Sequence, residues 1–196
     1  MVTVSGGATA AWPVRLPDNE ADAEEMINAA SYEHYFQNTQ NPKEVITSFY
    51  NAGIDAIANV MTMNFGTWRM NYDSSVALGM GATHNLIKEL RPTWSDTQAY
   101  QHVGMTPMIG IQDTSSGLEP YGPSREDDPA GSGYFTSETG VDNATFWSRK
   151  LKVGYLSFWS LGRDKPGTGV SGEFSGMNLP KYTYTEKFMQ GLDLYQ

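Results

Sequence analysis

The chain has 196 residues, a length that suits one domain with enough chain to bury a substantial core. Its formal net charge of −9 repels a phosphate backbone and an anionic membrane surface, so we expect neither nucleic acid nor a membrane as partner. The absence of cysteine excludes disulfides, thiolate metal sites and a cysteine nucleophile, and the three histidines share no metal-ligand spacing, so we expect no metal and no other cofactor.

The N-terminal half predicts a strand, two helices and a second strand. The β-branched run 2–4 before Ser5-Gly6-Gly7 predicts a strand that enters a turn. An acidic stretch after Pro17 predicts the first turn of a helix, and a second helix is expected from a cap at Asn41 to a stop at Gly53. The continuous apolar run 54–63 is typical of a parallel strand buried on both faces.

The alternation continues toward the C-terminus. Apolar residues at helical spacing over 76–90 predict a helix, and Ser95 with Gln98 forms a capping box for a short one. The remaining expected elements are buried strands over 103–111 and 153–159, a short helix over 142–148, and a helix capped by Thr183 and Glu186 that carries the stripe Tyr184, Phe188, Leu192 and Tyr195.

Two glycine-rich segments, 113–140 and 162–181, are expected to be long loops. The second contains the spacing Gly167-x-Gly169-x-x-Gly172, which has the glycine pattern of a dinucleotide-binding fingerprint without its structural context. No βαβ pattern surrounds it, so a nucleotide cofactor is not expected.

Four strand–helix repeats predict the α/β class, with a parallel sheet and helices outside it. A complete (β/α)8 barrel takes about 250 residues, so we expect a partial barrel of about four βα units, forming a single domain over 1–196. Half a barrel leaves two sheet edges and an apolar face open to water. We therefore expect a homo-oligomer, or a complementary chain that covers the open barrel.

Three segments resemble consecutive strands of one enzyme family. The segments 60–66, 103–110 and 156–164 resemble the sixth, seventh and eighth strands of the bacterial chitinases of glycoside hydrolase family 18, in matching order and spacing. The segment 92–98 is similar to the proline and capping box that precede strand seven in that family. The opening 4–7 matches either the fifth strand, by its distance from strand six, or a shortened third strand.

The resemblance implies a site for β-1,4-linked N-acetylglucosamine. In the family, the acetamide of the sugar attacks its own anomeric carbon, and a glutamic acid on strand four protonates the leaving oxygen. Trp159 matches the floor under the sugar, and Asn64 and Phe65 stand where the family has Asp and Tyr. Asparagine cannot carry the negative charge of aspartate, and phenylalanine has no hydroxyl to donate as tyrosine does. The substrate-binding residues implied are Trp159, Met61, Met63, Asn64, Phe65 and Met108.

No catalytic residue is assigned, because the strand-four signature Asp-x-x-Asp-x-Asp-x-Glu is absent. The most similar acidic stretch, residues 20–24, has alanines between its acidic residues and predicts the solvent-exposed first turn of a helix. The chain could be one piece of a split or longer enzyme, a degenerate relative that binds chitin-type oligosaccharides without cleaving them, or a structural protein that uses the half-barrel to assemble. An extracellular location is implied by the resemblance, although residues 1–5 do not resemble a signal peptide.

Several of the residues assigned to the site could instead be ordinary structural residues. Trp159 could be a core residue instead of the floor of a site, and the methionines are expected mainly to fill the core. Three further aromatic residues could line a sugar groove or be ordinary half-exposed side chains: Trp68, Tyr72 and Trp94.

Overall fold

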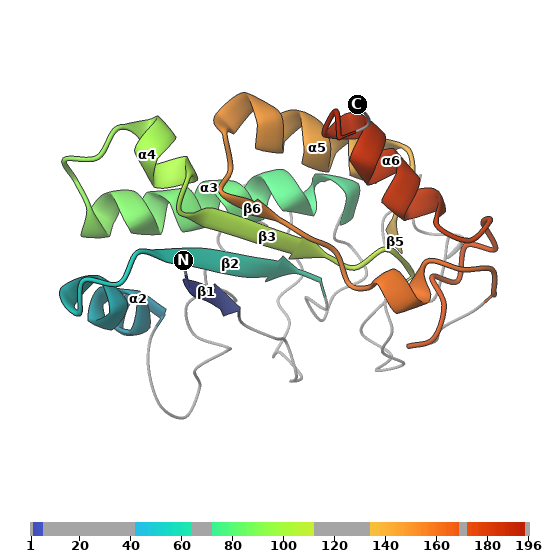
Figure 1. Cartoon of the computed structure of the whole chain (residues 1–196), viewed down its shortest axis with the longest axis horizontal. Coiled ribbons are helices and arrows are strands. Elements are labelled where there is room, and N and C mark those ends of the chain that lie inside the picture. The colour runs from blue at the N-terminus through green and yellow to red at the C-terminus, as the bar shows by residue number, and fades with distance from the viewer. Residues whose placement is uncertain (1, 6–41, 64–71, 112–133, 169–171, 195–196) are drawn as a thin grey trace, which may run out of the picture.

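The computed structural model of the protein describes residues 2–5, 42–63, 72–111, 134–168 and 172–194 (Figure 1). Several predictions lie outside these residues, namely the helix after Pro17, the acidic stretch 20–24, and the residues Asn64, Phe65, Trp68 and Tyr195.

A four-stranded parallel sheet forms the centre of the fold, in the order β1-β2-β3-β6. The strands are β1 (Val2–Ser5), β2 (Ala56–Thr62), β3 (Val103–Pro107) and β6 (Tyr155–Leu156). β2 is almost completely buried, as its mostly apolar sequence predicts. The predicted α/β class with a parallel sheet is therefore confirmed.

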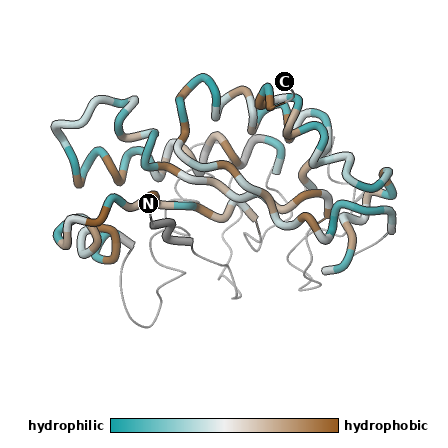
Figure 2. Tube along the Cα trace, viewed as in Figure 1, coloured by the Kyte–Doolittle hydropathy of each residue, from teal (hydrophilic) through white to brown (hydrophobic). Residues whose placement is uncertain are grey.

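The described helices are α2 (Pro42–Asn51), α3 (Tyr72–Leu90), α4 (Asp96–Tyr100), α5 (Thr139–Leu151) and α6 (Thr183–Gly191), with a 3-10 turn, η2 (Leu161–Arg163). Figure 1 shows α3, α5 and α6 on one side of the sheet, and Figure 2 shows hydrophobic stretches in α2 and along the central strands. The core fills the space between the strands and these helices. No helix of the described part is long and apolar enough to cross a membrane.

Two helix boundaries follow the local sequence signals. Gly53, at φ +74°, ends α2 in the left-handed conformation that glycine adopts easily, and the N–H of Ile54 donates to the carbonyl of Phe49 at 2.9 Å. At the start of α4, the Ser95 hydroxyl accepts from the N–H of Gln98, and the Gln98 side chain accepts from the N–H of Ser95. The predicted capping box is confirmed.

The expected single strand over 103–111 is wrong, because the chain turns at Gly110. A second strand, β4 (Gly110–Ile111), pairs antiparallel with β5 (Tyr134–Phe135), which falls inside the segment predicted to be a loop. At Gly110 φ is +70°, and a Cβ there would lie 2.1 Å from the carbonyl oxygen of Ser175. Only glycine fits so close to another backbone.

The expected buried strand over 153–159 is also wrong in length and burial. β6 comprises two residues, and Tyr155 is exposed, because β6 is an edge of the described sheet and β3 is its one partner there. Hydrogen bonds to β3 nevertheless continue past the strand, from the N–H of Ser157 to Met105 (3.0 Å) and from the N–H of Trp159 to Pro107 (2.8 Å).

α5 begins at Thr139, earlier than the predicted 142–148 and inside the predicted loop 113–140. A tertiary contact sets this start. The Asp73 carboxylate, at the beginning of α3, accepts from the N–H and the hydroxyl of Thr136 at 2.7 and 2.8 Å, and the Thr136 hydroxyl in turn accepts from the N–H of Gly140.

The predicted capping box of α6 is wrong. Tyr182 is the N-cap residue, with φ +70° and no side-chain cap hydrogen bond. Asp164 takes over the capping role from the segment after η2, because its carboxylate accepts from the N–H groups of Tyr184 (3.1 Å) and Thr185 (2.7 Å). The other predicted loop, 162–181, begins with η2 and contains a single antiparallel bridge between Thr168 and Met177 among its described residues.

Candidate functional site

The two faces of the sheet have different surroundings. Val60 and Thr62 face α3, since a Cβ added at Gly79 of that helix would meet both side chains within 3.3 Å. Successive residues of a strand point to opposite faces, so Asn59 and Met61 belong to the other face. We call this face, opposite α3, the inner face.

A row of polar side chains crosses the inner face from β2 to the segment after β6. Asn59 donates from Nδ2 to the Thr106 hydroxyl at 2.9 Å, and the Thr106 hydroxyl lies 2.6 Å from that of Ser157. Asn59 pairs in register with Gly104, two residues before Thr106, so its side chain reaches Thr106 diagonally along one face of the sheet. Asn59 is buried, whereas Thr106 and Ser157 are partly accessible. The row therefore offers hydroxyl groups toward the carboxyl end of the sheet.

Trp159 follows this row at the carboxyl end and is 48% exposed. Both of its backbone groups bond to the end of β3 and the residues after it, since its N–H donates to the carbonyl of Pro107 at 2.8 Å and its carbonyl accepts from the N–H of Ile109 at 3.0 Å. The peptide bond that follows Trp159 is cis. An exposed indole on a fixed backbone is a rigid apolar surface of the kind that stacks on a sugar ring. The interpretation of Trp159 as an ordinary core residue is wrong.

The methionines predicted to bind substrate differ in accessibility. Met63 and Met108 are each 1% exposed, and Met108 forms a bridge with Trp159. Met61 is half-buried. Met63 and Met108 therefore support the site from below the surface, and a direct contact of any of the three with sugar stays a prediction. Asn64 and Phe65 lie outside the described residues.

Two other aromatic residues do not line a sugar groove. Tyr72 is fully buried at the start of α3. Trp94 lies in the connection before β3, at the opposite end of the sheet from Trp159, where its ring packs 4.3 Å from His102 and 5.8 Å from Tyr50. Both are structural side chains, so for these two the groove interpretation is wrong.

The buried carboxylates of the described region hold loops and helices. Asp73 and Asp164 are 8% and 1% exposed, and both accept hydrogen bonds from the backbone, as described above. Burial raises the pKa of Asp73 above 3.8, and the hydrogen bonds from Thr136 oppose this shift. None of these hydrogen bonds connects either carboxylate to the polar row of Asn59, Thr106 and Ser157. No group of three metal-ligating side chains occurs among the described residues.

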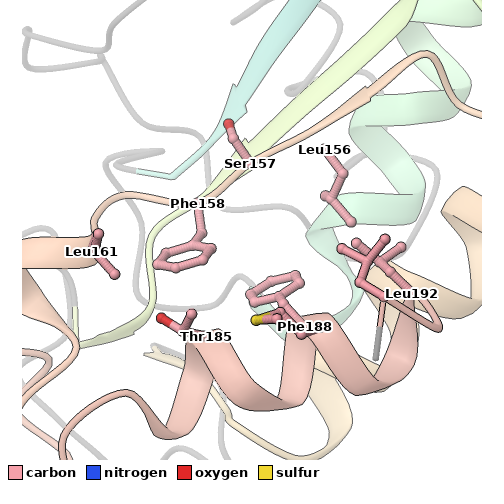
Figure 3. A pocket seen from close by; sticks show the side chains of 9 residues that line it. Leu156, Ser157, Phe158, Leu161, Thr185, Phe188 and Leu192 are labelled. Atoms are coloured by element: carbon pink, nitrogen blue, oxygen red, sulfur yellow. The ribbon is translucent and has the colours of Figure 1, made fainter. Parts of the chain in front are cut away.

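An apolar groove of about 400 Å³ lies on the other side of the β6 segment, between it and α6 (Figure 3). Its lining residues are Leu156, Ser157, Phe158, Leu161, Thr185, Phe188, Met189, Leu192 and Leu194. The rings of Phe158 and Phe188 stack on each other where the two walls meet, with centroids 5.0 Å apart, and Figure 3 shows the Ser157 hydroxyl pointing away from them. Sequence reasoning missed this groove, although the alternation of Leu156 and Phe158 with Ser157 signals a strand with one apolar face.

Comparisons with known proteins support the resemblance to chitinases. No protein-family model matches the chain. Over 143 residues it is 29% identical to the probable bifunctional chitinase/lysozyme of Escherichia coli strain K12. The predicted resemblance to chitinases is confirmed. The matching segment is 66% of this chain and 14% of the E. coli protein.

Solved chitinase structures show the fold. The catalytic domain of a hyperthermophilic chitinase from Pyrococcus furiosus superposes with a TM-score of 0.61 at 24% identity, over 78% of this chain and 46% of that one. The same values hold for catalytic-site mutants of active domain 2 of the P. furiosus chitinase complexed with chito-oligosaccharides. This chitinase-like chain thus spans less than half the length of these solved chains.

Proposed function

We propose that this chitinase-like chain binds a chitin-type oligosaccharide on the inner face of its sheet and does not cleave it alone. The observation that carries the proposal is Trp159, a residue that is 48% exposed at the carboxyl end of the sheet, after the hydroxyl row of Thr106 and Ser157. The solved P. furiosus structure in complex with chito-oligosaccharides supports the class of ligand.

The proposed architecture is one domain over 1–196 that forms half of a (β/α)8 barrel. Four parallel strands in one sheet support it, as does a match to 46% of a chitinase catalytic domain. β1 lies directly beside β2, which resembles strand six, so this adjacency favours the fifth-strand assignment of β1 over the third. In barrels of this type, sites form at the carboxyl ends of the strands, which is where Trp159 lies.

Two kinds of contact would hold the sugar. Burial of a pyranose face against the Trp159 indole contributes about 1–3 kcal/mol. The hydroxyl groups of Thr106 and Ser157 can each accept and donate a hydrogen bond, as sugar hydroxyls require. Neither contact needs a charged or titrating group, so binding would survive the loss of a catalytic acid. A polymeric ligand such as chitin would place the protein outside the cell.

The proposed lack of cleavage rests on the sequence. The acidic signature of strand four is absent, and phenylalanine and asparagine stand where tyrosine and aspartate would orient the acetamide. A general acid contributes about 10²–10⁴-fold to rate, and no glutamic acid of this chain lies between apolar neighbours on an expected strand.

Calorimetric titration with short chitin oligomers tests the binding proposal. We expect a millimolar dissociation constant for the natural chain and at least a fivefold weaker one for Trp159→Ala, matching about 1 kcal/mol of lost stacking. Phe146→Ala is the matched control, since Phe146 is 56% exposed on α5, away from the inner face, and should bind as the natural chain does. No binding, or equal binding by Trp159→Ala, would refute the proposal.

A second candidate function is assembly without sugar binding. The observation that favours it is the pair of sheet edges at β1 and β6, each with a single strand partner among the described residues. The titration separates the candidates, because a purely structural half-barrel binds no oligosaccharide through Trp159.

A further inference from the structure

We infer that Tyr182 is a second stacking platform for a chitin-type oligosaccharide, which contacts sugars beyond the one held by Trp159. The inference rests on the proposed function, because it extends the same site along the sugar chain. Four observations carry it: the place of Tyr182 in the fold, its backbone conformation, the surroundings of its ring, and its connection to Trp159.

Tyr182 lies at the carboxyl end of the sheet, where sites form in barrels of this type. It immediately precedes α6, the helix that follows the β6 segment along the chain. Figure 1 shows η2 and the first turn of α6 beyond the tips of the β2 and β3 arrows. Tyr182 is 42% exposed, close to the 48% of Trp159. Two exposed aromatic residues therefore belong to the same end of the sheet.

The backbone of Tyr182 has a conformation that is unfavourable for tyrosine. Its φ of +70° and ψ of 14° lie in the left-handed region, which is an outlier for a bulky side chain. Hydrogen bonds impose this conformation, since the N–H of Tyr182 donates to the carbonyl of Asp164 at 2.9 Å and its carbonyl accepts from the N–H of Glu186 at 2.9 Å. Glycine would fit without strain. Strained backbone of this kind is typical of functional positions.

The side chain of Tyr182 contributes little to the fold that imposes this strain. It makes no cap hydrogen bond to α6, and it is not part of the hydrophobic core of the described residues. Its ring contacts the ammonium of Lys181, which lies 4.6 Å from the ring centroid in a cation–π geometry. The ammonium covers one face of the ring, so the opposite face can take an apolar ligand.

The surroundings of Tyr182 suit a sugar better than a protein partner. Its neighbours in sequence are Lys181 and Thr183, so the ring stands between polar side chains. Protein interfaces present contiguous apolar patches. A pyranose ring instead has an apolar face and hydroxyl groups around its edge. The Tyr182 ring can stack on that face, and the Lys181 ammonium can donate hydrogen bonds to the hydroxyl groups.

A short connection relates Tyr182 to Trp159. The carbonyl that holds the N–H of Tyr182 belongs to Asp164, which follows Trp159 by five positions. A fully extended chain of that length spans at most about 18 Å, and the 3-10 turn η2 within it shortens the distance. An oligosaccharide of several sugars can therefore reach both rings, whereas a short one bound at Trp159 need not contact Tyr182.

Calorimetric titration of the full chain with a chitin disaccharide and a hexasaccharide tests the inference. We expect the natural chain to bind the hexasaccharide more tightly, because the longer ligand reaches both rings. Tyr182→Ala should bind the hexasaccharide about fivefold more weakly, the effect of one lost stacking contact, and the disaccharide as the natural chain does. Tyr182→Phe retains the ring and should bind both ligands normally. So should Phe146→Ala, the matched control on α5.

Urea unfolding of Tyr182→Gly distinguishes a ligand contact from a structural one. Glycine relieves the strain, so this variant should be at least as stable as the natural chain and more stable than Tyr182→Ala, while it binds the hexasaccharide as weakly as the alanine variant. A clear loss of stability in the glycine variant would assign Tyr182 a structural role and overturn the inference.

Two binding results would also overturn the inference: equal hexasaccharide binding by the natural chain and Tyr182→Ala, and equal weakening of both ligands in that variant. The proposed function fails on a different result, since it requires Trp159→Ala to weaken binding of the disaccharide. The two proposals can therefore fail separately.

Discussion

Asp164 caps a helix that begins 19 residues further along the chain, and Thr185 gives it two of its hydrogen bonds. The Asp164 carboxylate accepts from both the N–H and the hydroxyl of Thr185 at 2.7 Å, and from the N–H of Tyr184 at 3.1 Å. The carboxylate is buried and lies at the positive end of the α6 dipole. This contact fixes the helix that forms one wall of the apolar groove.

We therefore predict that Asp164→Ala lowers the free energy of unfolding by about 1–3 kcal/mol, because buried N–H groups lose a charged acceptor. Urea unfolding measures the loss. The control is Glu186→Gln, which changes the residue that the sequence pattern assigns to the cap and should stay within about 0.5 kcal/mol of the natural chain. A larger loss in the Glu186 variant would show that the local capping box, and not Asp164, stabilises the start of α6.

Arg163 is expected to stabilise the turn after β3, as Asp164 stabilises the start of α6. Its guanidinium is fully buried and donates to the carbonyls of Ile109 (3.0 Å) and Ile111 (2.6 Å). Arg163→Met leaves both acceptors without these donors and should cost about 2–5 kcal/mol in urea unfolding. Arg149→Met, which removes an exposed ion pair with Asp193, should cost at most about 1 kcal/mol. Similar losses in both variants would contradict the role of Arg163.

The raised pKa of Asp73 predicts a pH dependence with a definite sign. Because the folded chain binds this proton more tightly than the unfolded chain, Asp73 adds stability at low pH, and that contribution is lost as pH rises through the folded-state pKa. The difference in unfolding free energy between the natural chain and Asp73→Asn should therefore fall as pH rises above 3.8. Denaturant unfolding at a series of pH values checks this, and a difference that grows with pH would contradict it.

Thr136→Val offers a companion test of the same site. It removes the side-chain hydrogen bond that lowers the pKa of Asp73, so the pH window of the effect should extend upward. An unchanged window would show that this bond does not influence the carboxylate.

The hydroxyl of Thr106 links Asn59 to Ser157, so its removal should weaken sugar binding without changing the sheet. We predict that Thr106→Val raises the dissociation constant for chitin oligomers severalfold, corresponding to about 1 kcal/mol for a lost hydrogen bond. Thr106→Ser retains the hydroxyl and should bind as the natural chain does. Equal binding by the valine variant would remove the polar row from the proposed site.

The purified chain is predicted to release no product from chitin oligomers above the buffer rate, because no glutamic acid lies between apolar neighbours on an expected strand. Chromatography of the oligomers after prolonged incubation measures this. Turnover that disappears in Glu24→Gln would show that the alanine-spaced acids act as catalytic groups.

Features determined by neighbouring residues could be predicted from the sequence. Gly53 ends α2 and Ser95 caps α4, because in each case the signal and its partner lie within a few residues. The buried strand β2 was also predictable, since a short and mostly apolar run is typical of a strand covered on both faces. The exposed position of Trp159 is consistent with its place shortly after β6, which has one neighbouring strand among the described residues.

Features determined by distant contacts could not be predicted. The start of α6 depends on Asp164, the start of α5 on the link from Asp73 to Thr136, and the turn at Gly110 on the close approach of Ser175. Each involves a partner at a distance that no local pattern encodes. The apolar groove is of the same kind, since its walls come from the β6 segment and α6.

The order of the strands across the sheet is the same as their order along the chain. Each strand can therefore dock on the one made before it while the ribosome is still adding residues, and no strand has to wait for a later one to be inserted beside it. The groove exists only once α6 has been synthesised and capped. The wall that α6 contributes is therefore among the last parts of the described fold to form during synthesis.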